Sequence, residues 1–186
     1  VVAAVDSPKA LVLEDHSNSR EVSFAKLSAS IIYQSRLTLK QMENRVVKID
    51  FADFSSLRGD RDVLAAFDVG FVVMHEMAHG ALDLRDAASA AEEPGECESY
   101  INRIRRELNL PERLMYRARI VLSSKELEIT DRKVELSFAR SITKNGQSKT
   151  EHSYLRWNLA AVGGKTLPEA DLSETRERVK VTTGME

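Results

Sequence analysis

Residues 71–82 read Phe-Val-Val-Met-His-Glu-Met-Ala-His-Gly-Ala-Leu. An α-helix turns by about 100° per residue, so residues four positions apart project from one face, one turn apart. In a helix, His75 and His79 could therefore bind one metal ion through their imidazoles. Glu76 lies beside the first histidine, where its carboxylate can exchange a proton with a water at that ion. The stretch predicts a helix that supplies two metal ligands on one face and a base beside them.

The pattern around this stretch predicts one long buried helix from Asp62 to about Leu84. Apolar residues recur at spacings of three or four, and others cover much of the remaining circumference. Gly59-Asp60 supplies a break and a candidate N-cap. Polar groups in such a helix cost free energy to bury unless a partner compensates them, and a divalent cation is such a partner. This context disfavours the alternative that the two histidines and the glutamate are ordinary surface residues.

The third metal ligand must come from outside this stretch. The motif with a third histidine six residues beyond His79 is absent, because Arg85 occupies that position. A second helix is predicted over residues 96–108. On that helix Glu98 lies three residues before Ile101 in the apolar stripe, so it is expected to point towards the first helix. Glu98 is the predicted third ligand.

Other carboxylates could also be the third metal ligand. Glu96 lies about 160° around the second helix from Glu98, so the two cannot both point at one ion. Glu93, Asp83 and Asp86 lie at the end of the first helix or in the connection that follows it. Asp83 or Asp86 could instead support a ligating histidine through a hydrogen bond.

The flanks of the helical region are predicted to be strands. Six runs are apolar or alternate in the β manner: residues 10–13, 27–33, 45–54, 119–122, 127–130 and 134–141. Residues 27–33 are equally consistent with a helix. Asn145-Gly146 predicts a hairpin that pairs the last run with residues 152–157. The order of strands, two helices and strands predicts an α+β fold.

A chain of 186 residues can bury a core as one domain. We expect a single domain over residues 1–186, in four parts. These are a strand-rich part (1–58), a helical metal-binding core (59–117), β-hairpins (118–162) and a polar tail (163–186).

Composition excludes several classes of function. The net charge is −2, from 27 basic and 29 acidic residues, so there is no basic excess for binding nucleic acid. No apolar stretch reaches the roughly 18 to 20 residues that span a bilayer. The single cysteine, Cys97, excludes an internal disulfide and a cysteine-only zinc site, and we expect it to be a small core residue. The start Val-Val-Ala-Ala-Val favours a secreted or periplasmic protein, with a cytoplasmic one still open.

His75-Glu76-x-x-His79, followed by a glutamate on a later helix, resembles the gluzincin class of zinc metallopeptidases. Residues 102–116 also resemble the signature Asn-x-x-Arg-x-Glu-x-Gly-x-Pro-x-Arg-x-x-Tyr of bacterial effector-type zinc proteases and related toxin domains. Asn109 stands where that signature has glycine. The resemblance covers residues 67–116 and implies a zincin-like fold, with a central active-site helix and a second helix that carries a ligand.

The resemblance implies a role near the substrate for Arg113 and Tyr116. A guanidinium or a tyrosine hydroxyl could stabilise an oxyanion, although both residues could equally fix the turn after the helix. Asn102 could orient Glu98 or lie on the helix surface. His152, in the late hairpin, could reach the cleft as a hydrogen-bond donor.

Together these features predict a zinc-dependent hydrolase of peptide bonds, acting on a peptide or protein substrate. Zn²⁺ bound by His75, His79 and Glu98 would lower the pKa of a water in its fourth position to roughly 7, and Glu76 would accept the proton. The strand at 45–54 is expected at the cleft edge, where it could bind substrate by strand addition. Two alternatives stay open: a non-catalytic metal-binding protein with a closed site, and a metallohydrolase of a non-peptide substrate. Neither the oligomeric state nor the cleavage specificity follows from the sequence.

Overall fold

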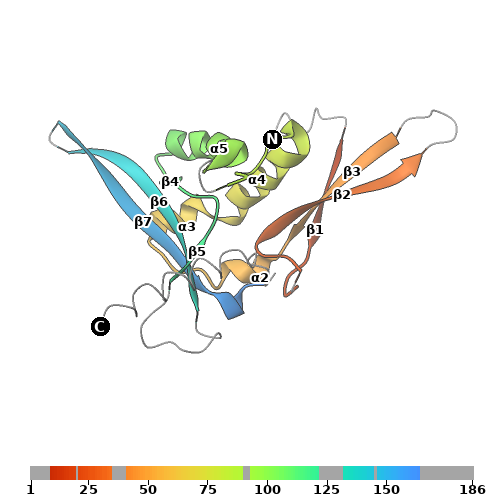
Figure 1. Ribbon diagram of the computed structural model, residues 1–186, viewed down its shortest axis with the longest axis horizontal. Coiled ribbons are helices and arrows are strands. Elements are labelled where there is room, and N and C mark those ends of the chain that lie inside the picture. The colour runs from red at the N-terminus through yellow and green to blue at the C-terminus, as the bar shows by residue number, and fades with distance from the viewer. Residues whose placement is uncertain are drawn as a thin grey trace, which may run out of the picture.

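The computed structural model describes residues 9–19, 21–34, 41–89, 93–121, 132–144 and 146–163. Strands precede and follow a central group of helices, so the fold is mixed α and β, as predicted (Figure 1). The elements are β1 (Ala10–Asp15), β2 (Ala25–Gln34), β3 (Gln41–Ile49), α2 (Phe51–Phe54), α3 (Arg61–Ala66), α4 (Val69–Leu82), α5 (Gly95–Glu107), β4 (Glu112–Arg113), β5 (Arg119–Val121), β6 (Lys133–Lys144), β7 (Gln147–Asn158) and the 3₁₀ turn η3 (Leu159–Ala161).

Two sheets flank the helices. The N-terminal sheet has the strand order β1-β3-β2, with β1 parallel and β2 antiparallel to β3. The C-terminal sheet is built on the long hairpin of β6 and β7, and the short strands β4 and β5 pair with β6. Figure 1 shows α4 and α5 between the two sheets.

The long helix predicted from Asp62 to Leu84 is two helices. α3 ends at Ala66, and the Asp68 carboxylate accepts a 3.0 Å hydrogen bond from the Phe71 amide at the start of α4. An aspartate cap satisfies an amide at a new helix start, so it divides an otherwise continuous apolar stripe. The histidine motif still lies within one helix, since α4 extends to Leu82.

The strand predicted over residues 45–54 ends at Ile49. Asp50 then caps α2 by accepting hydrogen bonds from the amides of Ala52 and Asp53, at 3.0 and 3.3 Å. β3 also lies between β1 and β2, so both of its edges are already paired. The expectation that this segment forms the cleft edge is therefore wrong.

The other strand predictions have clear outcomes. Residues 27–33 are strand, as part of β2. The late hairpin is confirmed, because β6 and β7 pair antiparallel from Lys133 with Asn158 to Lys144 with Gln147. The run at 127–130 and the tail beyond Gly163 lie outside the described residues.

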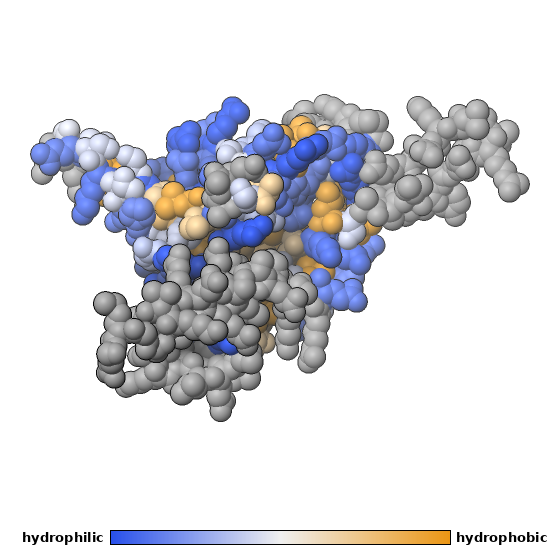
Figure 2. Space-filling model, viewed as in Figure 1, coloured by the Kyte–Doolittle hydropathy of each residue, from blue (hydrophilic) through white to orange (hydrophobic). Residues whose placement is uncertain are grey.

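An aromatic cluster in the core brings together residues from the N-terminal, central and C-terminal parts of the chain. The Phe24 ring meets those of Phe67 and Trp157 edge-on, with centroids 5.2 and 5.3 Å apart. Trp157 therefore packs into the core. On the face in Figure 2, hydrophilic side chains cover much of the described surface, and hydrophobic ones show in patches between them. No helix among the described residues is long and apolar enough to cross a membrane.

Candidate metal centre

Three donor atoms converge beside the second half of α4. The Nε2 atoms of His75 and His79 are 3.1 Å apart, and each lies 3.1 Å from Oδ1 of Asp86. Two ligands at 2.0–2.1 Å from a tetrahedral ion lie about 3.3 Å from each other. The triangle of donors thus has nearly the dimensions of one face of a metal coordination sphere.

With Cys97 these residues form a group of four that could hold a metal ion. One donor atom from each side chain lies within 4.8 Å of the other three. Cys97 is fully buried, and its thiol donates to the His75 carbonyl at 3.3 Å. The histidines lower the pKa of this thiol against the effect of burial, which raises it. Nitrogen, oxygen and sulfur donors together suit zinc and similar transition ions.

The chain after α4 brings Asp86 to this point. Asp83 ends the helix in the left-handed conformation, with φ of 53°. Asp86 then pairs with Gly95 through an isolated β-bridge. Gly95 has φ of 81°, and a Cβ on it would lie 2.4 Å from the amide nitrogen of Ala87. A glycine at this position therefore permits the close approach that places Asp86 beside the histidines.

The imidazole of His79 is oriented by the backbone. Its Nδ1 lies 2.6 Å from the Leu84 carbonyl oxygen, which can only accept a hydrogen bond. Nδ1 therefore carries the proton when the ring is neutral, and Nε2 keeps the lone pair that faces Asp86.

Glu98 lies on the other side of the His75 ring. Its Oε2 is 3.4 Å from Nδ1 of His75, while Nε2 faces Asp86. The carboxylate is fully buried, and it accepts hydrogen bonds from Arg105 and from Arg113, the latter at 3.0 Å. The predicted third ligand thus points towards α4, as expected, but it is outside the group of four. Asp86, an alternative that the sequence left open, lies in the group.

The electrostatics of the centre favour a cation. Burial would lower the pKa of His75, but the neighbouring Asp86, Cys97 and Glu98 side chains raise it to about 11. The pKa of His79 is raised to about 10, against burial, by Asp86, Cys97 and the Leu84 carbonyl. Two imidazolium ions only 3.1 Å apart would repel each other, so one divalent ion in place of their protons fits the site better.

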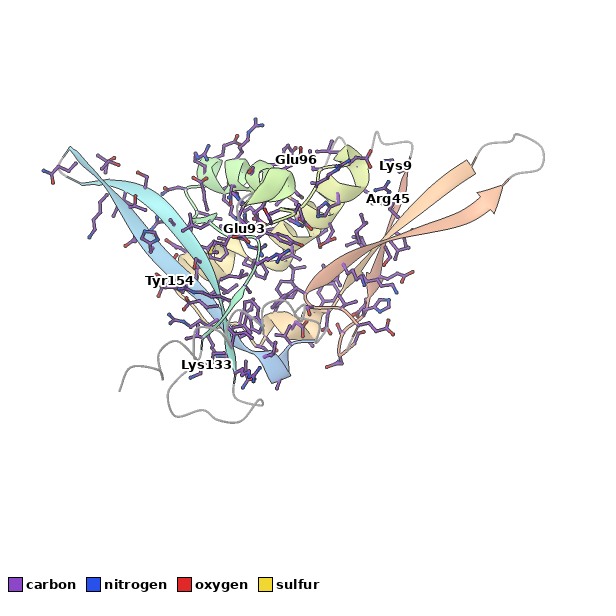
Figure 3. All side chains as sticks on the ribbon, viewed as in Figure 1. Lys9, Arg45, Glu93, Glu96, Lys133 and Tyr154 are labelled. Carbon is purple, nitrogen blue, oxygen red and sulfur yellow. The ribbon has the colours of Figure 1, made fainter. Side chains whose placement is uncertain are left out.

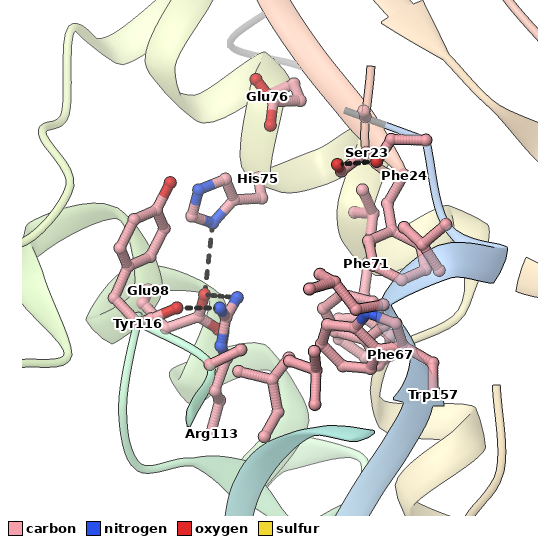
Figure 4. A pocket seen from close by; sticks show the side chains of 18 of the residues that line it. Ser23, Phe24, Phe67, Phe71, His75, Glu76, Glu98, Arg113, Tyr116 and Trp157 are labelled. Atoms are coloured by element: carbon pink, nitrogen blue, oxygen red, sulfur yellow. Dashed lines mark hydrogen bonds and ion pairs between the residues drawn. The ribbon is translucent and has the colours of Figure 1, made fainter. Parts of the chain in front are cut away.

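Glu76 lies next to this centre and faces the edge of the N-terminal sheet. Its Oε2 accepts a 2.8 Å hydrogen bond from the Leu27 amide of β2. Burial raises the pKa of Glu76, while positive charge on His75 and His79 acts against that rise. A carboxylate whose pKa is raised towards neutrality is suited to proton transfer. Figure 4 shows Glu76 and His75 together at one end of a cavity.

Tyr116 and Arg113 have different surroundings. The Tyr116 ring stacks on His75, with centroids 5.9 Å apart and planes inclined by 13°. Burial and the neighbouring Asp86 carboxylate raise the pKa of its hydroxyl, which therefore stays protonated. The Arg113 guanidinium is engaged by Glu98 and by the carbonyls of Met115 and Tyr116. These bonds hold the segment that follows β4, in line with one of the two roles considered for Arg113, and its side chain also lines a cavity at the centre.

The remaining candidates lie outside the group of four. Asn102 is buried and ties α5 to β4, because its amide exchanges hydrogen bonds of 2.7 and 2.8 Å with the backbone of Arg113. Glu96 accepts from the Arg85 amide, and Glu93 from the Arg117 amide. His152 is exposed on β7 and lines neither cavity at the centre.

Two cavities open at the metal centre. One of about 310 Å³ is largely apolar and lies between α4 and the C-terminal sheet (Figure 4). The other, of about 440 Å³, is polar and lies beside the start of β2. Ala25, Glu76 and Tyr116 line both cavities, whereas Cys97 lines neither. Glu76 and Tyr116 are therefore accessible from both cavities, while the cysteine is closed off from both.

No protein-family model, curated protein or solved structure matches this chain. The sequence motif located His75, Glu76 and His79 but gave Cys97 only a packing role. Cys97 lies four residues before Ile101, on the apolar stripe of a helix expected to face α4, and this spacing was a signal that its side chain points into the packed side of the helix.

Proposed function

We propose that this protein is a zinc-dependent peptidase in which His75, His79 and Asp86 hold the ion. The main support is that Nε2 of His75, Nε2 of His79 and Oδ1 of Asp86 lie 3.1 Å from one another. The carboxylate of Glu76, next to His75 in the sequence, supplies the base. Bound zinc would supply a Lewis acid for the substrate carbonyl and a water of lowered pKa.

Glu98 acts in this proposal as a positioning residue for His75. A carboxylate behind a ligating imidazole fixes the orientation of the ring and increases its basicity. Glu98 has the required place at Nδ1, and the charges of Arg113 and Arg105, with His75, hold its pKa well below the usual range against the effect of burial. Its charge is already compensated by two guanidinium groups, which makes it a poorer ligand than Asp86.

Glu76 and Tyr116 perform the proton transfer and charge stabilisation. Because the Leu27 amide holds Oε2 of Glu76, the Oε1 atom is left to accept a proton from the attacking water and return it to the leaving amine. The protonated hydroxyl of Tyr116 would donate to the oxyanion that forms at the carbonyl.

β2 takes the role that the sequence assigned to the strand at 45–54. It is an edge strand of its sheet, and its Leu27 amide points towards the proposed base. An extended peptide could lie along this edge and present a bond to Glu76.

Zinc content and cleavage of a mixed peptide library test the proposal. We expect one zinc per chain and cleavage by the native protein, with cleavage lost and zinc retained in Glu76→Gln. A native protein that binds no metal after zinc loading at neutral pH would contradict the metal centre. A zinc-loaded protein that cleaves nothing in the library would contradict the peptidase.

The position of Cys97 favours a second candidate, a metal-binding protein without turnover. A thiolate as fourth ligand would fill the position that catalytic zinc keeps open. Cobalt substitution separates the two, because thiolate-bound Co²⁺ has a charge-transfer band in the near ultraviolet. A band in the native protein that disappears in Cys97→Ala supports the closed site; its absence supports the peptidase.

A further inference from the structure

Aromatic rings form much of the wall of the apolar cavity at the metal centre. Four buried aromatic side chains line it: Phe24, Phe67, Phe71 and Trp157. Figure 4 shows Phe67, Phe71 and Trp157 on one side of the cavity and Arg113 with Glu98 on the other. A group that enters the cavity would therefore lie against rings contributed by different parts of the chain.

The charges around this cavity balance, and those opposite the rings already bind each other. Two carboxylates and two guanidinium groups line the cavity: Glu76, Glu98, Arg105 and Arg113. Oε1 of Glu98 accepts from Arg105, and its Oε2 accepts from Arg113 at 3.0 Å. The other two nitrogens of Arg113 donate to the carbonyls of Met115 and Tyr116. A charged group entering here would lose its water without gaining a free counter-charge, which favours an uncharged occupant.

The arrangement of the rings favours an aromatic occupant over an aliphatic one of the same size. The plane of the Phe24 ring is inclined by 90° to that of Phe67 and by 84° to that of Trp157. Rings inclined in this way present both edges and faces to their surroundings. An entering ring can form offset or edge-to-face pairs with them, which are favourable beyond the burial of apolar area.

The cavity begins at the groups proposed for catalysis, since His75, Glu76 and Tyr116 line it. A side chain next to the cleaved bond would therefore enter it. Ala118, a small and partly buried residue of the wall just before β5, leaves room for that side chain. Resting on the peptidase activity proposed above, we propose that the substrate is a peptide with an aromatic side chain next to the cleaved bond, bound in this cavity.

The selectivity should have a part that depends on size and a part that depends on the ring. A change of one methylene in an apolar pocket alters kcat/KM by about 10-fold or more, so alanine in place of phenylalanine should cost at least about 10-fold. Cyclohexylalanine is close to phenylalanine in size but has no π-system, and the loss of ring contacts should cost about 2- to 10-fold. Lysine should be a poorer residue than phenylalanine, because it finds no free counter-charge.

Two substitutions change the cavity in opposite directions. Ala118→Leu fills part of it, and Val72→Ala enlarges it from the side of α4. Ala65→Leu makes the same change as the first at a partly buried position of α3 that lines neither cavity, and it serves as the matched control. Zinc content and thermal unfolding check that each variant is folded.

Trp157 reports occupation of the cavity without any need for cleavage. It is the only tryptophan of the chain, and it lines the cavity. Side chains alternate between the two faces of a strand, and Figure 3 shows Tyr154, three residues earlier on β7, on the side away from the helices. The tryptophan emission of zinc-loaded Glu76→Gln should therefore change when a Phe peptide binds, and much less with an Ala peptide at the same concentration.

The kinetic measurement is kcat/KM for peptides that differ only in one residue beside a central bond, on either side of it. That residue is phenylalanine, cyclohexylalanine, alanine, lysine or naphthylalanine. We expect the native protein and Ala65→Leu to prefer phenylalanine over the first three alternatives. Ala118→Leu should bring the ratio of the Phe and Ala peptides close to one, and Val72→Ala should raise kcat/KM for naphthylalanine relative to phenylalanine.

The outcomes distinguish this inference from the function on which it rests. Cleavage without preference for phenylalanine over alanine or cyclohexylalanine, or a preference that neither cavity variant changes, would overturn the inference and leave the peptidase intact. If Ala118→Leu does not fold, the native preferences and Val72→Ala decide the matter. A selective change in tryptophan emission without cleavage of any peptide would support the recognition and overturn the peptidase. Neither an emission change nor cleavage would overturn both.

Discussion

The amide of Leu27 donates a 2.8 Å hydrogen bond to Oε2 of Glu76 and so links the edge strand β2 to the helix that carries the two histidines. The residue proposed as the base is thus held by the same strand edge along which substrate would lie. In the proposed peptidase, a peptide along this edge would lie next to the carboxylate, because β2 and α4 meet at that point.

Glu76→Gln should abolish proton transfer while leaving the metal centre intact. Its amide oxygen can still accept the bond from Leu27, but the amide cannot take a proton from water. We expect kcat/KM to fall by about 10²- to 10⁴-fold, with zinc content unchanged. Steady-state kinetics and elemental analysis check this, and retention of more than a tenth of the native activity would exclude Glu76 as the base.

Asp86→Asn should weaken zinc binding, because it removes the charge of the donor that lies 3.1 Å from both histidines. We expect a loss of at least about 100-fold in affinity, more than is typical of a residue that only supports a ligand. The matched control is Asp83→Asn, three residues earlier and exposed, whose partners are Lys9 and Arg45. Competition with a chromophoric chelator measures both, and equal effects would contradict the role of Asp86.

Glu98→Gln separates a positioning role from a ligand role. The substitution leaves Arg105 and Arg113 buried without their anion, so we expect the free energy of unfolding to fall by about 3 to 5 kcal/mol. Zinc affinity should fall by about 10- to 100-fold through the altered support of His75. X-ray absorption should show the same number of oxygen and nitrogen ligands as in the native protein. Loss of one oxygen ligand would identify Glu98 as a ligand after all.

Zinc binding should release protons and strengthen as the pH rises. The pKa values of about 11 for His75 and about 10 for His79 mean that protons compete with zinc at neutral pH. Binding near pH 7.5 should therefore release at least about one proton per ion, and affinity should fall as the pH is lowered from 8 to 6. Calorimetry in buffers of different ionisation enthalpy counts the protons.

The control for this count is His152→Ala, since that histidine is exposed on β7. It should not change the number of protons released. An affinity that does not vary between pH 6 and 8 would contradict ligation by the two histidines.

Helical periodicity was sufficient to predict the faces of His75, Glu76 and His79, because these positions depend only on the turn of one helix. It could not predict the place of Asp86, which depends on the left-handed conformation of Asp83 and on the contact of Gly95 with the chain near Ala87. Both features arise from tertiary packing, so no periodic pattern in the sequence indicates them.

Helical periodicity correctly predicted that Glu98 points towards α4, but it did not predict which groups bind its carboxylate. Two cations bind this carboxylate: Arg105, two turns further along the same face of α5, and Arg113, from the following strand. The central position of β3 was also hidden, since its parallel pairing with β1 joins segments separated by about thirty residues and leaves no local signal.

Tyr116→Phe should reduce kcat with little change in KM, because the hydroxyl is proposed to donate only to the charge that develops at the carbonyl oxygen. Loss of one such donor typically costs about 10²- to 10³-fold in kcat. The stacking of the ring on His75 is preserved in phenylalanine, so zinc content should stay at the native level. Tyr154→Phe removes the same hydroxyl from a tyrosine of β7 that packs against Arg119 and Arg156, and it should leave kcat unchanged. A rise in KM alone for Tyr116→Phe would show instead that Tyr116 binds the ground state of the substrate, since a group used only in the transition state does not alter ground-state affinity.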